Sequence, residues 1–240
     1  MTDYYWVDLY INYEEQNLYD LISNTVDALV NNGCKFKALE YSRSDDPGMA
    51  FDEQNFSADK KVIDMQVAIE HTADDLKSWF DGPGSSKVIP GTKLIFECEL
   101  KTDGTDPGSE EIDVSFWRGE DLLFFNIVII SLHVPMEVVL DGSDPEHYKH
   151  NKSMIVGMVR NLYERTGPFF GWMDYEEHSS DRSYPQYTGG KFPDANDYVI
   201  VGKELSGRLE KQILKYDDNK WEKLFDGGYL IKGLNNKDDF

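Results

Sequence analysis

Three strand-like segments follow one another between residues 94 and 134, and this succession constrains the fold more than any other feature of the chain. In the first segment, apolar residues such as Leu94 and Phe96 alternate with Glu97 and Glu99. This period of two is typical of a half-buried strand. The turn-forming sequences TDGTDPGS and RGED separate the three segments. We therefore expect a β-meander in this part of the chain.

The third segment, LLFFNIVIISLHV at residues 122–134, is apolar at almost every position. A strand that is apolar on both faces is typical of the centre of a sheet that is covered on each side. The run is too short to span a bilayer, and Asn126, Ser131 and His133 interrupt it. We expect a central strand and not a membrane segment.

The beginning of the chain predicts a β-α-β unit. Alternating apolar residues at 5–13 indicate a strand. Apolar residues at three- and four-residue steps between 18 and 30 indicate a helix, which the sequence NNG ends. Residues 35–41 are predicted as a second strand, and the turn-rich residues 42–59 as a loop.

The later elements are predicted from the same kinds of pattern. Alternation at 63–69 predicts a strand, and residues 71–80 predict a short helix with Thr72 as its N-cap. Pro145 stands where the first residue of a further helix is expected. The sequence at 226–228, Asp-Gly-Gly, predicts the turn of a C-terminal hairpin.

This order of elements predicts an α+β fold. We expect a largely antiparallel mixed sheet with helices packed on it, an opening β-α-β unit, a central β-meander and a C-terminal β-hairpin. A chain of 240 residues can bury the core of one such domain, so we assign 1–240 to a single domain. The likeness of YYWVD (4–8) to FFGWMD (169–174) leaves open two related halves, 1–140 and 141–240.

Charge is the outlier in the composition. Acidic residues outnumber basic residues 45 to 24, which gives a formal net charge of −21 and a pI near 4.5. So much negative charge repels phosphate backbones and anionic headgroups, which argues against nucleic-acid and membrane-surface binding. The same charge favours a basic protein partner. No feature of the sequence fixes the oligomeric state.

The two cysteines, Cys34 and Cys98, are predicted to be plain thiols. Two cysteines in a chain of this length are not the pattern of a disulfide framework. Thiols indicate a reducing compartment. The N-terminal sequence MTDYYWVDLY also has neither the basic region nor the apolar region of a signal peptide. We therefore expect a cytoplasmic protein.

The candidate site is the segment 171–187, GWMDYEEHSSDRSYPQY, where carboxylates stand among aromatic rings. Aromatic residues give a protein-binding surface large contact area at a small cost in conformational entropy. We predict that this surface faces a protein partner and contains Trp172, Asp174, Tyr175, Glu176, Glu177, Asp181, Tyr184 and Tyr187.

Two other chemistries can be drawn from the same residue types. Asp174, Glu177 and His178 would serve as the catalytic group of a hydrolase-like enzyme, with or without a divalent cation. The spacing of this cluster matches no calcium loop. His147 and His150 stand three residues apart on a predicted helix, which is the spacing of a metal-ligand pair. We favour a partly packed His150, aligned with the buried stripe, and expect no metal.

No cofactor is expected, because the chain contains neither a phosphate-binding loop nor a dinucleotide fingerprint. Three further aromatic residues, Trp6, Tyr10 and Trp117, alternate with the apolar rows of their strands. Two interpretations of them stay open: an exposed binding surface, or a face that helices cover.

The sequence therefore predicts a non-enzymatic, acidic interaction protein that binds a basic protein partner. Inhibitor and immunity proteins that neutralise basic toxins share this composition, which is an analogy of charge and size. The alternative is the hydrolase-like enzyme with its carboxylate and histidine cluster at 174–181.

Overall fold

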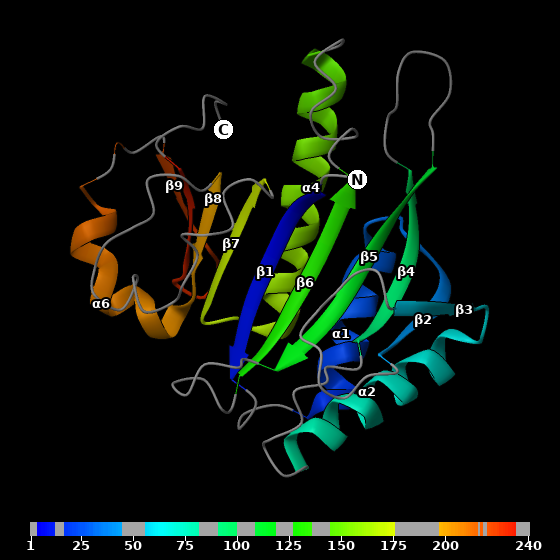
Figure 1. Cartoon of the computed structure of the whole chain (residues 1–240). Helices are drawn as coiled ribbons and strands as arrows, with labels where there is room; N and C mark the ends of the chain where they lie inside the picture. Colours follow the sequence, from blue (N-terminus) through cyan, green and yellow to red (C-terminus); the bar gives the residue numbers. More distant parts are fainter. Residues whose placement is uncertain are drawn as a thin grey trace.

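A computed structural model gives the fold. It shows one antiparallel sheet with helices packed against it, which confirms the predicted α+β class (Figure 1). The structure describes residues 4–12, 17–44, 56–81, 91–99, 109–118, 127–135, 145–175, 197–215, 217 and 220–233.

Within these segments the sheet contains ten strands in the order β3-β2-β4-β5-β6-β1-β7-β8-β10-β9. The strands are β1 Tyr4–Asn12, β2 Lys35–Ser44, β3 Phe56–Lys61, β4 Gly91–Glu99, β5 Ser109–Arg118, β6 Ile127–Pro135, β7 Phe170–Tyr175, β8 Tyr198–Val201, β9 Trp221–Lys223 and β10 Tyr229–Lys232. The helices are α1 Leu18–Asn31, α2 Met65–Asp81, α4 Pro145–Thr166 and α6 Lys203–Ile213.

The consecutive strands β4, β5 and β6 are neighbours in the sheet and pair antiparallel, in a register that aligns Leu94, Val114 and Leu132. β6 then pairs with β1, so the most apolar strand lies near the middle of the sheet. Alternation along the strands gives each a row of residues that point to the helices, as in β1, where every second residue is buried.

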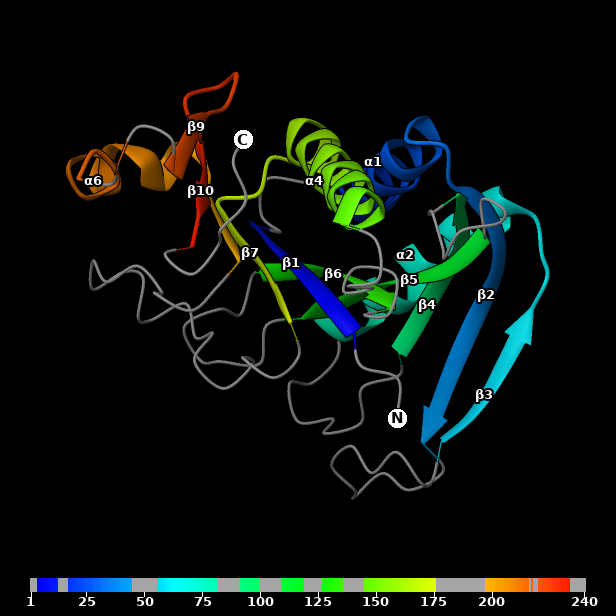
Figure 2. The same ribbon diagram turned by 90° about the horizontal axis from the view of Figure 1, so that it is seen from above.

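Helices α1, α2 and α4 cover one face of the sheet (Figure 2). Apolar residues of these helices form the main core with the inward rows of the strands. Helix α6 packs on the opposite face, where Leu209 and Ile213 form a smaller core with residues of β7, β8 and β10, among them Trp172 and Val199. The helices therefore leave the opposite face of β4, β5, β6 and β1 without a helical layer among the described residues.

Glycine and proline mark the predicted helix ends. α1 is followed by Gly33 at a φ of 85°, and α4 by Gly167 at a φ of 59°, both in the left-handed region that glycine tolerates. α4 begins at Pro145 as expected. Gly227, at a φ of 98°, lies between the paired strands β9 and β10.

Residues 63–69 are not a strand, so that prediction is wrong. Helix α2 already begins at Met65, and the Asp64 carboxylate accepts a hydrogen bond from the Gln66 N–H at 2.9 Å. Thr72, predicted as the N-cap, is a buried residue inside the helix. The helix buries Ile69 and Leu76 and leaves Val67 exposed. Burial in this segment therefore follows the helical period of about 3.6 residues and not the alternation of a strand. The predicted loop at 42–59 contains the start of β3 and the end of β2.

The prediction of plain thiols is also wrong. Cys34 and Cys98 form a disulfide between the start of β2 and the end of β4, and the chain has no other cysteine. The argument for a reducing compartment therefore no longer holds. Within the described segments, no helix combines the length and apolar character that a bilayer-spanning helix needs.

Candidate functional site

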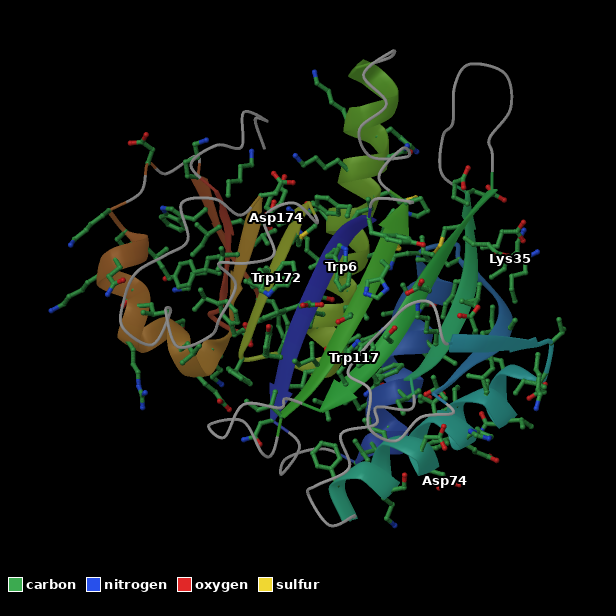
Figure 3. All side chains as sticks on the ribbon, in the orientation of Figure 1. Trp6, Lys35, Asp74, Trp117, Trp172 and Asp174 are labelled. Atoms are coloured by element: carbon green, nitrogen blue, oxygen red, sulfur yellow. A yellow bond between two sulfur atoms is a disulfide. The ribbon has the colours of Figure 1, made fainter. Side chains whose placement is uncertain are left out.

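The candidate site lies on the face of β4, β5, β6 and β1 that points away from α1, α2 and α4, which we call the open face (Figure 3). On β1 this face carries the half-buried residues Trp6, Asp8 and Tyr10. The strand alternates because its other side faces the core. This face thus carries polar and aromatic side chains with no described helix above it, although Ser115, Ser131, His133 and Asp174 on it are at most 5% exposed.

Strand register aligns these side chains in two neighbouring rows across the sheet. One row runs through Asp113, His133, Trp6 and Asp174 on β5, β6, β1 and β7. The next row runs through Lys93, Ser115, Ser131, Asp8 and Trp172. We call the polar members of the two rows, together with Trp6, the open-face cluster: Trp6, Asp8, Lys93, Asp113, Ser115, Ser131, His133 and Asp174.

An ion-paired triplet forms the centre of the cluster. Asp113 Oδ1 contacts Nδ1 of His133, and Asp113 Oδ2 lies 3.5 Å from Nζ of Lys93. Burial alone would raise the pKa of the Asp113 carboxyl, but the hydrogen bond and charge of His133, with the charge of Lys93, lower the pKa below its ordinary value. Asp113 is therefore ionised at neutral pH, so Nδ1 of His133 donates the hydrogen bond.

The Trp6 ring packs against the His133 ring, with the ring centroids 4.1 Å apart. His133 is only 5% exposed. In the part of the chain that the structure describes, Nε2 of His133, Oγ of Ser115 and Nε1 of Trp6 are buried and have no hydrogen-bond partner. Burial of polar atoms without partners costs free energy, so each of these three atoms calls for an explanation.

A second pair lies in the neighbouring row. Ser131 Oγ donates a hydrogen bond to Oδ1 of Asp8 at 2.5 Å. Ser115 and Ser131 are 1% and 3% exposed, so this row buries two hydroxyl groups.

The chemistry that this arrangement allows is limited. A carboxylate that accepts from Nδ1 of a histidine fixes the orientation of the ring; in a neutral ring Nε2 is then a proton acceptor, and in a charged ring both nitrogens donate. Among the described residues, no group of three or more His, Cys, Asp or Glu side chains is arranged to hold a metal ion. The pairing of the Asp113 carboxylate with the His133 ring is an arrangement that can move a proton or bind a polar group.

Two members of the predicted binding surface are buried, so the prediction of an exposed Asp174 and Trp172 is wrong. Asp174 is 1% exposed and lies opposite Trp6 of the neighbouring strand β1. Trp172 is 2% exposed because it packs in the core beneath α6. The side chain of Tyr175 and residues Glu176, Glu177, His178, Asp181, Tyr184 and Tyr187 lie outside the described residues.

The prediction of a partly packed His150 is wrong as well, because His150 is exposed on α4. At this turn the buried residues are Asn151 and Lys152. Lys152 pairs with Asp197 at 3.1 Å, and Asp197 accepts a 2.6 Å hydrogen bond from the hydroxyl of Tyr5. The side chain of His147 lies outside the described residues.

The sequence left open whether the aromatic residues of this face are an exposed binding surface or are covered by helices, and the structure lies between these two alternatives. Trp6, Tyr10 and Trp117 are all half-buried. Trp6 and Tyr10 pack against the edge of the smaller core beneath α6, and Trp172 Nε1 donates to the Tyr10 hydroxyl at 3.4 Å. Each ring thus keeps an accessible part on a supported side chain.

Sequence reasoning missed most of the open-face cluster. Asp113 and Ser115 alternate with the apolar residues of β5, and Ser131 and His133 alternate with apolar residues late in β6. Polar residues at every second position of two successive apolar strands are a signal that would have placed both pairs on one face.

No protein-family model and no curated protein sequence matches the chain. Among solved structures, a T6SS protein from Pseudomonas aeruginosa is similar to it, with 10% sequence identity and a TM-score of 0.45. The alignment covers 96% of this chain, whereas this chain spans 65% of that protein's length.

Proposed function

We propose that this chain is a non-enzymatic interaction protein that binds a basic protein partner, in the manner of an inhibitor or immunity protein. The observation that carries the proposal is the surplus of 21 negative charges, which is 45 acidic residues minus 24 basic ones. A net charge of this size attracts a basic partner over long range and speeds the encounter.

The open face fits the anatomy of such an interface. Binding surfaces combine rigid aromatic rings near the centre with a polar rim. Here the half-buried Trp6, Tyr10 and Trp117 lie in or beside the rows that carry Asp8 and Asp113. Rings that are already packed on one side lose little conformational entropy when a partner covers the other.

The predicted binding segment continues this surface in sequence. Asp174 stands in the same row as Trp6, and Tyr175, Glu176 and Glu177 follow it directly along the chain. We propose that Tyr175, Glu176, Glu177, Asp181, Tyr184 and Tyr187 provide acidic and aromatic contacts to the partner.

The experiment uses a panel of purified basic proteins, each immobilised separately. Glu111→Gln removes one exposed charge on β5, and Glu164→Gln removes one exposed charge on α4, beneath the sheet. We expect Glu111→Gln to slow association about 2–5-fold, since an exposed charge contributes about 0.5–1 kcal/mol. Glu164→Gln should leave the rate nearly unchanged.

A second matched pair tests the aromatic part of the surface. Trp117→Ala removes a half-buried ring on the open face, and Phe225→Ala removes a ring that is 73% exposed between β9 and β10. Trp117→Ala should weaken binding about 10-fold or more, and Phe225→Ala should not. If none of the basic proteins binds the unmodified chain, the proposed function fails.

The Asp113 and His133 pair favours one alternative, a hydrolase-like activity in which Nε2 of His133 acts as the base. Its test is hydrolysis of a nitrophenyl ester and a nitrophenyl phosphodiester by the purified chain, compared with His133→Ala. Turnover that disappears in this variant, without loss of folding, would favour the enzyme over the binding protein.

A further inference from the structure

The Cys34–Cys98 disulfide lies inside the main core. The two cysteines are 2% and 1% exposed, and both belong to the apolar cluster between the sheet and helices α1, α2 and α4. Sγ of Cys34 lies 3.7 Å from the sulfur of Met158 on α4. A reagent that must touch either sulfur therefore needs an opening of the core.

Backbone pairing is what brings the two cysteines together. Their Cα atoms are 4.3 Å apart, the spacing of directly opposed residues in antiparallel strands, and the next pair along is Lys35 with Glu97. The Cys34 N–H donates to the carbonyl of Leu29, which fixes the residue at the end of α1. The sulfurs thus meet once α1 is formed and β2 has paired with β4.

We propose that Cys34 and Cys98 are oxidised after β2 has paired with β4 and before α4 closes over them. The oxidant is a disulfide donor, and the reaction is thiol–disulfide exchange. One cysteine thiolate attacks the donor disulfide and forms a mixed disulfide, which releases one donor thiolate. The second cysteine thiolate then displaces the other donor sulfur. The two electrons pass to the donor, which leaves as a dithiol, and the two cysteine protons pass to solvent or to the donor thiolates.

Oxidation during folding requires a disulfide donor, so the proposal places the chain in a compartment that supplies such donors. Cytosolic thiol reductants keep most cysteines reduced, so a buried structural disulfide is typical of oxidising compartments. The inference is independent of the proposed binding function, because it rests on the burial and pairing of the two cysteines. It also replaces the expectation of a cytoplasmic protein.

Thiol trapping in the producing cells tests the compartment. Cells are quenched with acid, the chain is unfolded, and free thiols are labelled with a maleimide polymer that shifts the band on a gel. We expect no labelled cysteine without prior reduction and two labelled cysteines after it. Two labelled cysteines without reduction would overturn the proposal.

Reduction of the purified chain tests the order of closure. Dithiothreitol should reduce the native disulfide about 100-fold more slowly than the disulfide of the chain in guanidinium, because reduction must await an opening of the core. Met158→Ala removes the side chain that covers Cys34 and should speed native reduction severalfold more than Met154→Ala, a change on the same helix at a partly buried position. Equal rates for native and unfolded chain, or for the two variants, would contradict closure by α4.

Discussion

Replacement of both Cys34 and Cys98 by alanine is expected to lower the free energy of unfolding by about 4 kcal/mol through the unfolded state alone. The two cysteines are separated by 64 positions in the sequence. For a loop of this length, loop closure removes about 14 cal/mol/K of entropy from the unfolded chain, which is about 4 kcal/mol at 25 °C. Domains are stable by about 5–15 kcal/mol in total, so this loss is a large share.

Alanine is the better replacement, because serine would bury a hydroxyl group in an apolar cluster. The assay is urea unfolding followed by tryptophan fluorescence, with four samples: unmodified and double-variant chain, each with and without reductant. Once the disulfide has been reduced in urea, reductant should lower the urea midpoint of the unmodified chain, and it should leave the midpoint of the variant unchanged.

Neither the reduced unmodified chain nor the variant contains the disulfide, so the difference between their free energies of unfolding measures the effect of the side-chain replacement on core packing. The reasoning would be refuted if the oxidised and reduced unmodified chains unfolded at the same urea concentration. It would also be refuted if the variant were as stable as the oxidised chain.

Three further changes follow from the structure. Asp113→Asn should cost about 1–3 kcal/mol near pH 7, because His133 and Lys93 lose a charged partner. The pKa of Asp113 is lowered in the folded chain, so the ionised carboxylate stabilises the fold above the unfolded pKa of about 4, and this stabilisation is lost as the pH falls through the folded pKa. The urea midpoints of Asp113→Asn and of the unmodified chain should therefore converge in acid. Gly228→Ala should cost about 1–3 kcal/mol in the same assay, because the added Cβ would lie 2.8 Å from the carbonyl oxygen of Val201 and would collide with the Tyr163 hydroxyl. Tyr163→Phe removes a hydrogen bond of 2.8 Å to Asp226 and should cost about 1 kcal/mol; a midpoint unchanged from that of the unmodified chain would count against this contact.

The regular part of the fold could be predicted from the sequence because its signals are local. Alternation along β1 and β4, the glycine after α1 and the proline at the start of α4 each act within a few residues. The start of α2 was missed because Ile63, Met65, Val67 and Ile69 alternate as in a strand, while the helical spacing of Ile69 and Leu76 decides the burial.

The disulfide and the site could not be predicted in this way because they depend on distant pairing. Cys34 and Cys98 meet only through the register of β2 with β4. The open-face cluster is assembled from β4, β5, β6, β1 and β7, and no strand contributes more than two of its members. Asp174 was predicted as part of a binding surface because its own segment is acidic, whereas in the structure it is buried beside Trp6 of β1.

The salt dependence of binding tests the central claim most directly. The association rate of the chain with a basic protein from the same panel is measured from about 0.01 to 0.5 M salt, where the Debye length shortens from about 30 Å to a few ångströms. If the surplus negative charge guides binding, the rate should fall steeply across this range, and Glu111→Gln should fall less steeply than Glu164→Gln. A rate that stays constant across the range would contradict the account.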